Sequence, residues 1–136
     1  MSRRTPSESN PFYLPKNMYL TAVRYCLQYP ELKRQLAQLQ ATAGMKAVAY
    51  TGMPHGSGIS SPTEQTAILI AEIERKIKVI ETAVKETSPE LYKWLLIGVT
   101  RETNYDYLRH RKGMPCGYRQ YHKAKQAVYH KISQAI

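Results

Sequence analysis

The sequence predicts an all-α protein, with an N-terminal helical hairpin that contains a long, coiled-coil-like helix, followed by a C-terminal three-helix unit of helix-turn-helix type. Apolar residues recur at helical spacing over most of the 136 residues, and no segment shows the alternation with period two that marks a strand. The last helical segment also sorts into two opposed faces. A hydrophobic content of 43% is enough for a packed core.

The chain begins with a polar stretch, so residues 1–12 are expected to form a disordered tail. A first helix is predicted from about Lys16 to Gln28, with Pro30 ending it. Its apolar face consists of Tyr19, Ala22, Val23, Cys26 and Leu27.

A second helix is predicted from about Glu31 to Ala43, with Gly44 as its C-cap. Its apolar side carries Leu32, Leu36 and Leu39. Residues 45–60 show no helical or strand period and are expected to form a long loop. The glycines at 52–58 do not make a phosphate-binding loop, because the Gly-Lys-Ser/Thr ending and a preceding strand are both missing.

The third helix has a clear start, with Ser61 as N-cap, Pro62 in the first turn and Glu64 three residues after the cap. Its apolar residues then follow spacings of three and four, as in a coiled coil. We call Ile70, Ile73, Ile77, Ile80 and Val84 the isoleucine seam. The seam is expected to pack on the leucine side of the second helix, which makes residues 13–87 an N-terminal hairpin. Alternatively, the seam over residues 70–84 joins two copies of the chain.

Residues 88–136 are predicted to form the helix-turn-helix unit. A fourth helix begins at Ser88-Pro89-Glu90, and a short fifth helix begins at Thr103, with Asp106 as its capping partner. The breaker-rich segment 113–117 precedes the sixth helix. The expected core comprises Leu91, Trp94, Leu95, Tyr105, Leu108, Tyr121, Val128 and Ile132.

The polar face of the sixth helix carries residue types that read base edges in the major groove. Arginine makes bidentate contacts to guanine, and glutamine makes them to adenine. The predicted base-reading residues are Arg119, Gln120, Lys123 and Gln126. The predicted phosphate contacts are Arg109, Arg111, Lys112, Tyr118, Lys125, His130 and Lys131.

The charge distribution favours a nucleic-acid partner. The formal net charge is +10, and residues 101–136 carry eight Lys and Arg against two acidic residues, a balance of +6. Residues 62–100 carry five against six, a balance of −1. The basic excess therefore gathers away from the third helix, and double-stranded DNA is the expected partner.

Other classes of function find little support in the sequence. His110, Cys116 and His122 match no common zinc spacing and lack a fourth ligand, so neither a metal nor another cofactor is expected. Helical spacing brings together no acid pair or nucleophile–base set, and Cys116 is expected to pack or cap rather than react. The protein is therefore not expected to be an enzyme. Without an apolar span or a disulfide framework, the expected location is the cytoplasm.

Several short motifs occur together in this chain. They include Ser88-Pro89-Glu90, Gly98-Val99-Thr100, Tyr107-Leu108 and Met114-Pro115-Cys116-Gly117-Tyr118-Arg119-Gln120-Tyr121, and, nearer the N-terminus, Tyr29-Pro30-Glu31-Leu32 and Gly58-Ile59-Ser60-Ser61-Pro62-Thr63-Glu64. With these motifs the chain resembles the RinA/ArpU-type late transcriptional regulators, small phage and prophage proteins of Gram-positive bacteria. The resemblance implies a sigma-like helix-turn-helix in the C-terminal third, a role in transcription, and RNA polymerase as a partner.

The sequence thus predicts a phage DNA-binding transcriptional regulator that reads the major groove with its C-terminal helix. One alternative is a small terminase-like DNA-packaging subunit, which would form a ring through the isoleucine seam. Another is a helical adaptor that binds an acidic protein.

Overall fold

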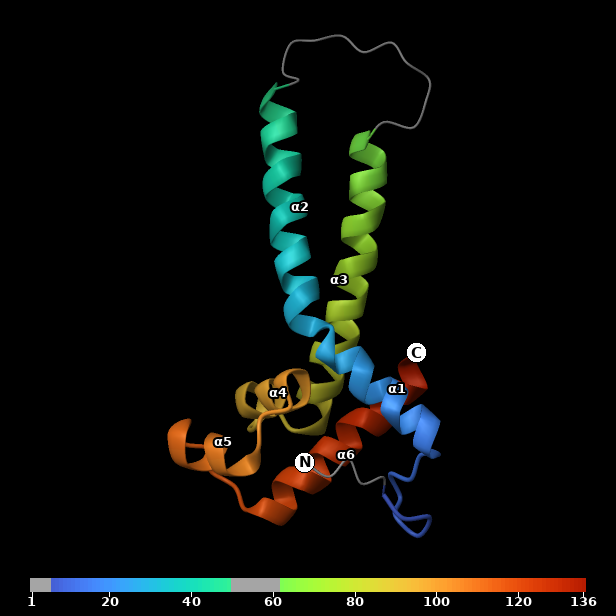
Figure 1. Cartoon of the computed structure of the whole chain (residues 1–136), viewed down its shortest axis with the longest axis vertical. Coiled ribbons are helices and arrows are strands. Elements are labelled where there is room, and N and C mark those ends of the chain that lie inside the picture. Colours follow the sequence, from blue (N-terminus) through green and yellow to red (C-terminus); the bar gives the residue numbers. More distant parts are fainter. Residues whose placement is uncertain (1–5, 50–61) are drawn as a thin grey trace. The chain divides into compact units, whose positions relative to one another are not determined.

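The computed structural model describes residues 6–49 and 62–136, and within these ranges the chain is helical with no strand (Figure 1). The predicted all-α class is therefore confirmed. The helices are α1 (Lys16–Leu27), α2 (Tyr29–Ala49), α3 (Pro62–Thr87), α4 (Tyr92–Arg101), α5 (Tyr105–Arg111) and α6 (Tyr118–Ala135). No helix in the described ranges is long and apolar enough to cross a membrane.

The chain divides into two compact units. The first comprises residues 1–30 together with 79–136, and the second comprises residues 31–78. The expected boundary between residues 13–87 and 88–136 does not coincide with this division. The difference arises because α1 packs against α4 and α6, so the first helix joins the C-terminal helices instead of the hairpin.

The first unit is built around the apolar faces of α1, α4 and α6 (Figure 1). Its core includes the predicted face of α1, together with Leu95 and Val99 of α4 and Leu108 of α5. On α6 the buried residues are Tyr121, Ala127, Val128, Tyr129 and Ile132. This buried face is wider than the sequence predicts, because α1 packs on α6 in addition to α4.

The segment before α1 is ordered and packs on the first unit. Pro6 and Leu14 are buried, and the side chain of Asn10 accepts a hydrogen bond from the backbone N–H of Phe12 at 2.9 Å. The expectation of a disordered tail over residues 1–12 is therefore wrong for residues 6–12. A segment with turns rather than a helix has no period that would reveal its packing. Residues 1–5 lie outside the described ranges.

In the second unit, α2 and α3 run in opposite directions, as a hairpin requires (Figure 1). Leu32 of α2 is buried, and so are Ile73 and Ile77 of the isoleucine seam. The remaining seam residues that are fully buried, Ile80 and Val84, belong to the core of the first unit. The seam is therefore divided between the two units, whereas all of it was expected to pack on the leucine side of the second helix.

The end of α2 differs from the prediction. The helix continues through Gly44 to Ala49, so Gly44 is an interior residue and not a C-cap. A glycine in a helix interior costs only about 1 kcal/mol relative to alanine, which neighbouring residues readily offset. The expected loop over residues 45–60 is therefore helical over 45–49, while residues 50–60 and the Ser61 cap lie outside the described ranges.

Candidate functional site

The connection between α5 and α6 is fixed by hydrogen bonds to its backbone. The indole N–H of Trp94 donates to the carbonyl of Lys112 at 2.8 Å. The hydroxyl of Tyr105 donates to the backbone carbonyl of Cys116 at 2.9 Å. The backbone N–H of Met114 donates to the carbonyl of Leu108 at 3.0 Å. Gly113 adopts a φ of +71°, a left-handed conformation that favours glycine. These contacts hold the start of α6 in a defined place.

The start of α5 is capped by Asn104, whose side chain accepts a hydrogen bond from the N–H of Tyr107 at 2.8 Å. The sequence analysis placed this cap one residue too early, at Thr103. Asparagine is among the strongest N-cap residues, so the correct position also has a sequence signal. Thr103 serves α6 instead, because its carbonyl accepts a hydrogen bond from Tyr121 Oη at 3.1 Å.

The first turns of α6 present the predicted base-reading side chains to solvent. Arg119, Gln120 and Lys123 are exposed. None of them makes a hydrogen bond or an ion pair with another described residue. Their polar groups therefore remain available for a ligand outside this chain.

The end of α5 adds exposed basic groups. Arg109, Arg111 and Lys112 are all exposed, as the phosphate role requires. Arg109 also has an internal role, because its Nη1 donates to the carbonyl of Met114 at 2.9 Å. Lys112 lies over the ring of Tyr107, with Nζ 5.8 Å from the ring centroid.

The remaining predicted DNA contacts are engaged inside the protein. Gln126 accepts a hydrogen bond from the side-chain amide of Asn10 at 3.0 Å, and His130 packs edge-on against Phe12. The ammonium of Lys131 lies 3.7 Å from a carboxylate oxygen of Glu86. The N-terminal segment thus packs on Gln126 and His130 in the second half of α6, and the predicted contacts of α6 that are exposed lie at the start of the helix.

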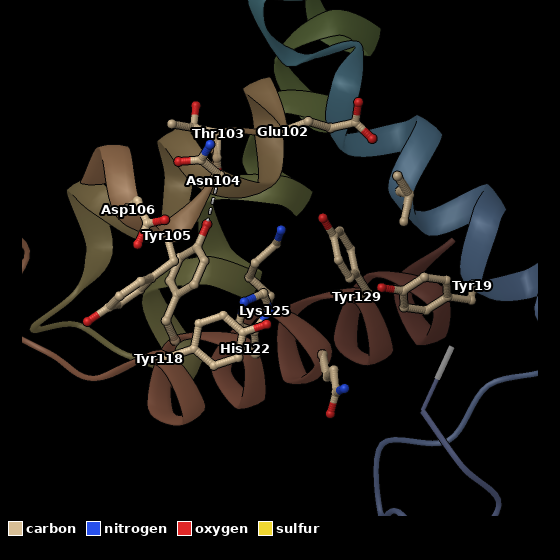
Figure 2. Close-up of a pocket in the computed structure, with 13 residues that line it drawn as sticks. Tyr19, Glu102, Thr103, Asn104, Tyr105, Asp106, Tyr118, His122, Lys125 and Tyr129 are labelled. Carbon is tan, nitrogen blue, oxygen red and sulfur yellow. Dashed lines mark hydrogen bonds between the residues drawn. The ribbon is translucent and has the colours of Figure 1, made fainter. Parts of the chain in front are cut away.

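Tyr118 and Lys125 line a cavity of about 480 Å³ within the first unit (Figure 2). The walls come from α1, from the α4–α5 connection, from α5 and from α6. The lining residues are Tyr19, Val23, Glu102, Thr103, Asn104, Tyr105, Asp106, Tyr118, Tyr121, His122, Lys125, Gln126 and Tyr129. Five of them are tyrosines, so the cavity is largely aromatic.

Burial shifts the protonation of the groups in this cavity. It lowers the pKa of the Lys125 ammonium, while the nearby carboxylate of Glu102 and thiol of Cys26 oppose that shift. The pKa of His122 is also lowered, first by burial and then by the charge of Lys125. Burial raises the pKa of the Tyr129 phenol well above its usual value. Tyr129 is only 3% exposed, and its hydroxyl makes no hydrogen bond within the described residues.

The described residues show no group of three or more His, Cys, Asp or Glu side chains that could hold a metal ion. Both cysteines are buried and free. Burial raises the pKa of Cys26 to about 12 and also raises that of Cys116, which disfavours the reactive thiolate in each case.

The cavity was not predicted from the sequence, although a signal for it is present there. Tyr121, Lys125 and Tyr129 follow one another at spacings of four, which places them on one side of a helix. That side includes the apolar face, so Lys125 lies between two aromatic core residues. Because Lys125 is charged, it was expected to contact phosphate, but its position in the helical repeat places it on the inward side of α6.

Comparisons of the chain with models of protein families, with curated proteins and with solved structures find no match in any of the three.

Proposed function

We propose that this protein is a sequence-specific DNA-binding transcriptional regulator, and that the first turns of α6 enter the major groove. The observation that carries the proposal is the exposed trio Arg119, Gln120 and Lys123 at the start of a helix held by a hydrogen-bonded turn. In helix-turn-helix proteins, residues near the start of the second helix are the ones that reach base edges. The phage setting and the partnership with RNA polymerase follow from the resemblance to RinA/ArpU-type regulators.

Electrostatics supports the same surface. Arg109, Arg111 and Lys112 precede the turn, and their exposed charges suit phosphates flanking the groove. Phosphate contacts of this kind supply affinity that falls with salt and carries no sequence information. The proposed interface therefore combines a base-reading part on α6 with a phosphate-binding part at the end of α5.

The test is fluorescence anisotropy of labelled duplexes with random and selected sequences, measured across a salt series. The Arg119→Ala/Lys123→Ala double variant is compared with Lys16→Ala/Lys85→Ala, which removes the same charge at exposed positions outside the proposed interface. The first pair is expected to lose selectivity by about tenfold or more, since a good bidentate contact is worth about 1–3 kcal/mol. The second pair is expected to lower the affinity slightly and equally for all sequences.

Absence of duplex binding at low salt would refute the proposal and favour a helical adaptor for a protein partner. If the two double variants changed affinity and selectivity equally, α6 would act only as a general basic surface and would not read bases. Light scattering tests the packaging alternative, which requires a stable ring of many copies. A monomer or dimer is expected, because Ile73, Ile77, Ile80 and Val84 are buried within one chain.

A further inference from the structure

We propose that the cavity behind the first turns of α6 binds a small aromatic carboxylate, with the carboxylate on Lys125 and Tyr129 and the ring among the tyrosines. This site is independent of DNA binding, because Arg119, Gln120 and Lys123 do not line the cavity. A volume of about 480 Å³ lies within the range of about 300–1,000 Å³ that is usual for sites of small molecules.

Two hydrogen-bond donors enter the cavity without an acceptor. The amino group of Lys125 and the hydroxyl of Tyr129 point to the same side of the cavity, toward the α4–α5 connection (Figure 2). Neither makes a hydrogen bond with another described residue. No buried side-chain nitrogen or oxygen of the described residues lacks a hydrogen-bond partner, so these two donors reach the open space of the cavity, where a ligand can meet them. A carboxylate can accept from both donors at once.

The lowered pKa of Lys125 fits an anionic ligand. Burial opposes the charged form of the amine, so an anion that binds next to it recovers part of that cost. The other titratable groups that line the cavity restrict the charge of the ligand. The carboxyl groups of Glu102 and Asp106 also line the cavity, and burial lowers the pKa of His122. A ligand with a single negative charge therefore fits better than a phosphate with two.

The aromatic walls define the rest of the ligand. The rings of Tyr105 and Tyr118 pack edge to face, with centroids 5.6 Å apart, and Tyr118 lies 4.1 Å from the ring of His122. On the opposite side, Tyr19 and Tyr129 pack edge to face at 5.3 Å. Planar rings pack well against such walls through offset and edge contacts, worth about 0.5–1.5 kcal/mol per pair beyond the buried area.

The test is isothermal titration calorimetry of the full chain, without DNA, with indole-3-acetate and 1-naphthoate as probes. Three control compounds separate the contributions: indole-3-acetamide has the ring without the charge, cyclohexanecarboxylate has the charge without an aromatic ring, and inorganic phosphate is a free anion. We expect each aromatic acid to bind at least about tenfold more tightly than each control compound, because a charge-assisted hydrogen bond is worth about 1.5–3 kcal/mol.

Two variants locate the binding. Lys125→Met removes the ammonium but keeps the stem, and Tyr129→Phe removes only the hydroxyl. We expect Lys125→Met to weaken the acids about tenfold and to leave the acetamide unchanged, with a smaller loss for Tyr129→Phe. Lys123→Met, which removes an exposed charge from the same helix, is the matched control and is expected to bind like the native chain.

Equal binding of the acid and the acetamide would overturn the proposal, and so would an equal loss in Lys125→Met and Lys123→Met. Absence of binding by both aromatic acids would also overturn it. If Lys125→Met fails to fold, which circular dichroism reveals, Tyr129→Phe and the comparison of acid with amide still decide the outcome. Failure here leaves the DNA interface untouched, because the exposed trio is tested separately with duplexes.

Discussion

The hydroxyl of Tyr121 occupies the space where a side chain on Gly98 would begin. A Cβ built on Gly98 would lie 2.1 Å from Tyr121 Oη, far inside contact distance. The same hydroxyl donates to the carbonyl of Thr103. The absence of a side chain on α4 thus lets α6 approach closely enough to tie itself to the α4–α5 connection. This contact sets the place of α6, and with it both the exposed trio and the cavity.

Gly98→Ala is expected to destabilise the fold by about 1–3 kcal/mol, because the added methyl group overpacks the contact with Tyr121. Urea denaturation of the single variants and of Gly98→Ala/Tyr121→Phe measures the effect. The double variant is expected to lose less than the sum of the two single variants, since Phe removes the clashing oxygen. Gly117→Ser, where a Cβ meets nothing within 4 Å, is the control and is expected to change stability by only a few tenths of a kcal/mol. Additive losses would contradict this account.

Asn104→Ala is expected to cost about 1 kcal/mol of stability, because it removes the side-chain acceptor that caps α5. Thr103→Ala is the comparison, since Thr103 acts through its backbone carbonyl, which alanine retains. Thermal and urea unfolding of both variants test the assignment. A larger loss for Thr103→Ala than for Asn104→Ala would restore Thr103 as the cap.

Gln120 and Gln126 are expected to differ in their effect on DNA binding, although both were predicted to read bases. Gln120 is exposed, whereas Gln126 accepts a hydrogen bond from Asn10. Gln120→Ala should therefore reduce sequence selectivity in the anisotropy assay. Gln126→Ala should leave selectivity unchanged and cost about 0.5–1.5 kcal/mol of stability, a loss that Asn10→Ala should exceed, because Asn10 also accepts a hydrogen bond from the N–H of Phe12. A selectivity loss confined to Gln126→Ala would reverse these roles.

His122 is expected to make the fold less stable in mild acid. Its pKa is lowered in the folded chain by burial and by Lys125, so below about pH 6.5 the unfolded chain takes up more protons than the folded one. Stability is therefore retained above that pH and is lost as the pH falls. The free energy of unfolding, measured at about pH 7.5 and about pH 5.5, should fall less in His122→Gln than in the native chain. An equal fall in both proteins would place the acid sensitivity elsewhere.

The features that were predicted well from the sequence are those that periodicity encodes. Leu95, Leu108 and Val128 were expected in the core and are fully buried. The partner of an amphipathic face is not encoded in its period, and for that reason α1 was assigned to the hairpin rather than to α6. Lys125 was likewise predicted to contact phosphate because of its charge, whereas its position in the helical repeat places it beside the buried tyrosines of the cavity.

The site was predictable only where a side chain keeps its usual preference for solvent. Arg119, Gln120 and Lys123 are exposed as expected, because nothing in the described chain competes for them. Gln126 and His130 are only partly exposed, because Asn10 and Phe12 contact them, and these two residues lie more than a hundred positions earlier in the chain. Contacts between such distant residues depend on the final packing of the helices, which local sequence patterns do not specify.

The packing of α1 on α6 has a consequence for how the chain is made. The apolar face of α1 leaves the ribosome long before α6, one of the helices that cover it. Tyr19, Val23 and Cys26 therefore reach their full burial only after α6 has been synthesised. Contacts between distant segments also form slowly, because a long loop has to close first. During that interval the apolar face of α1 stays exposed in the nascent chain.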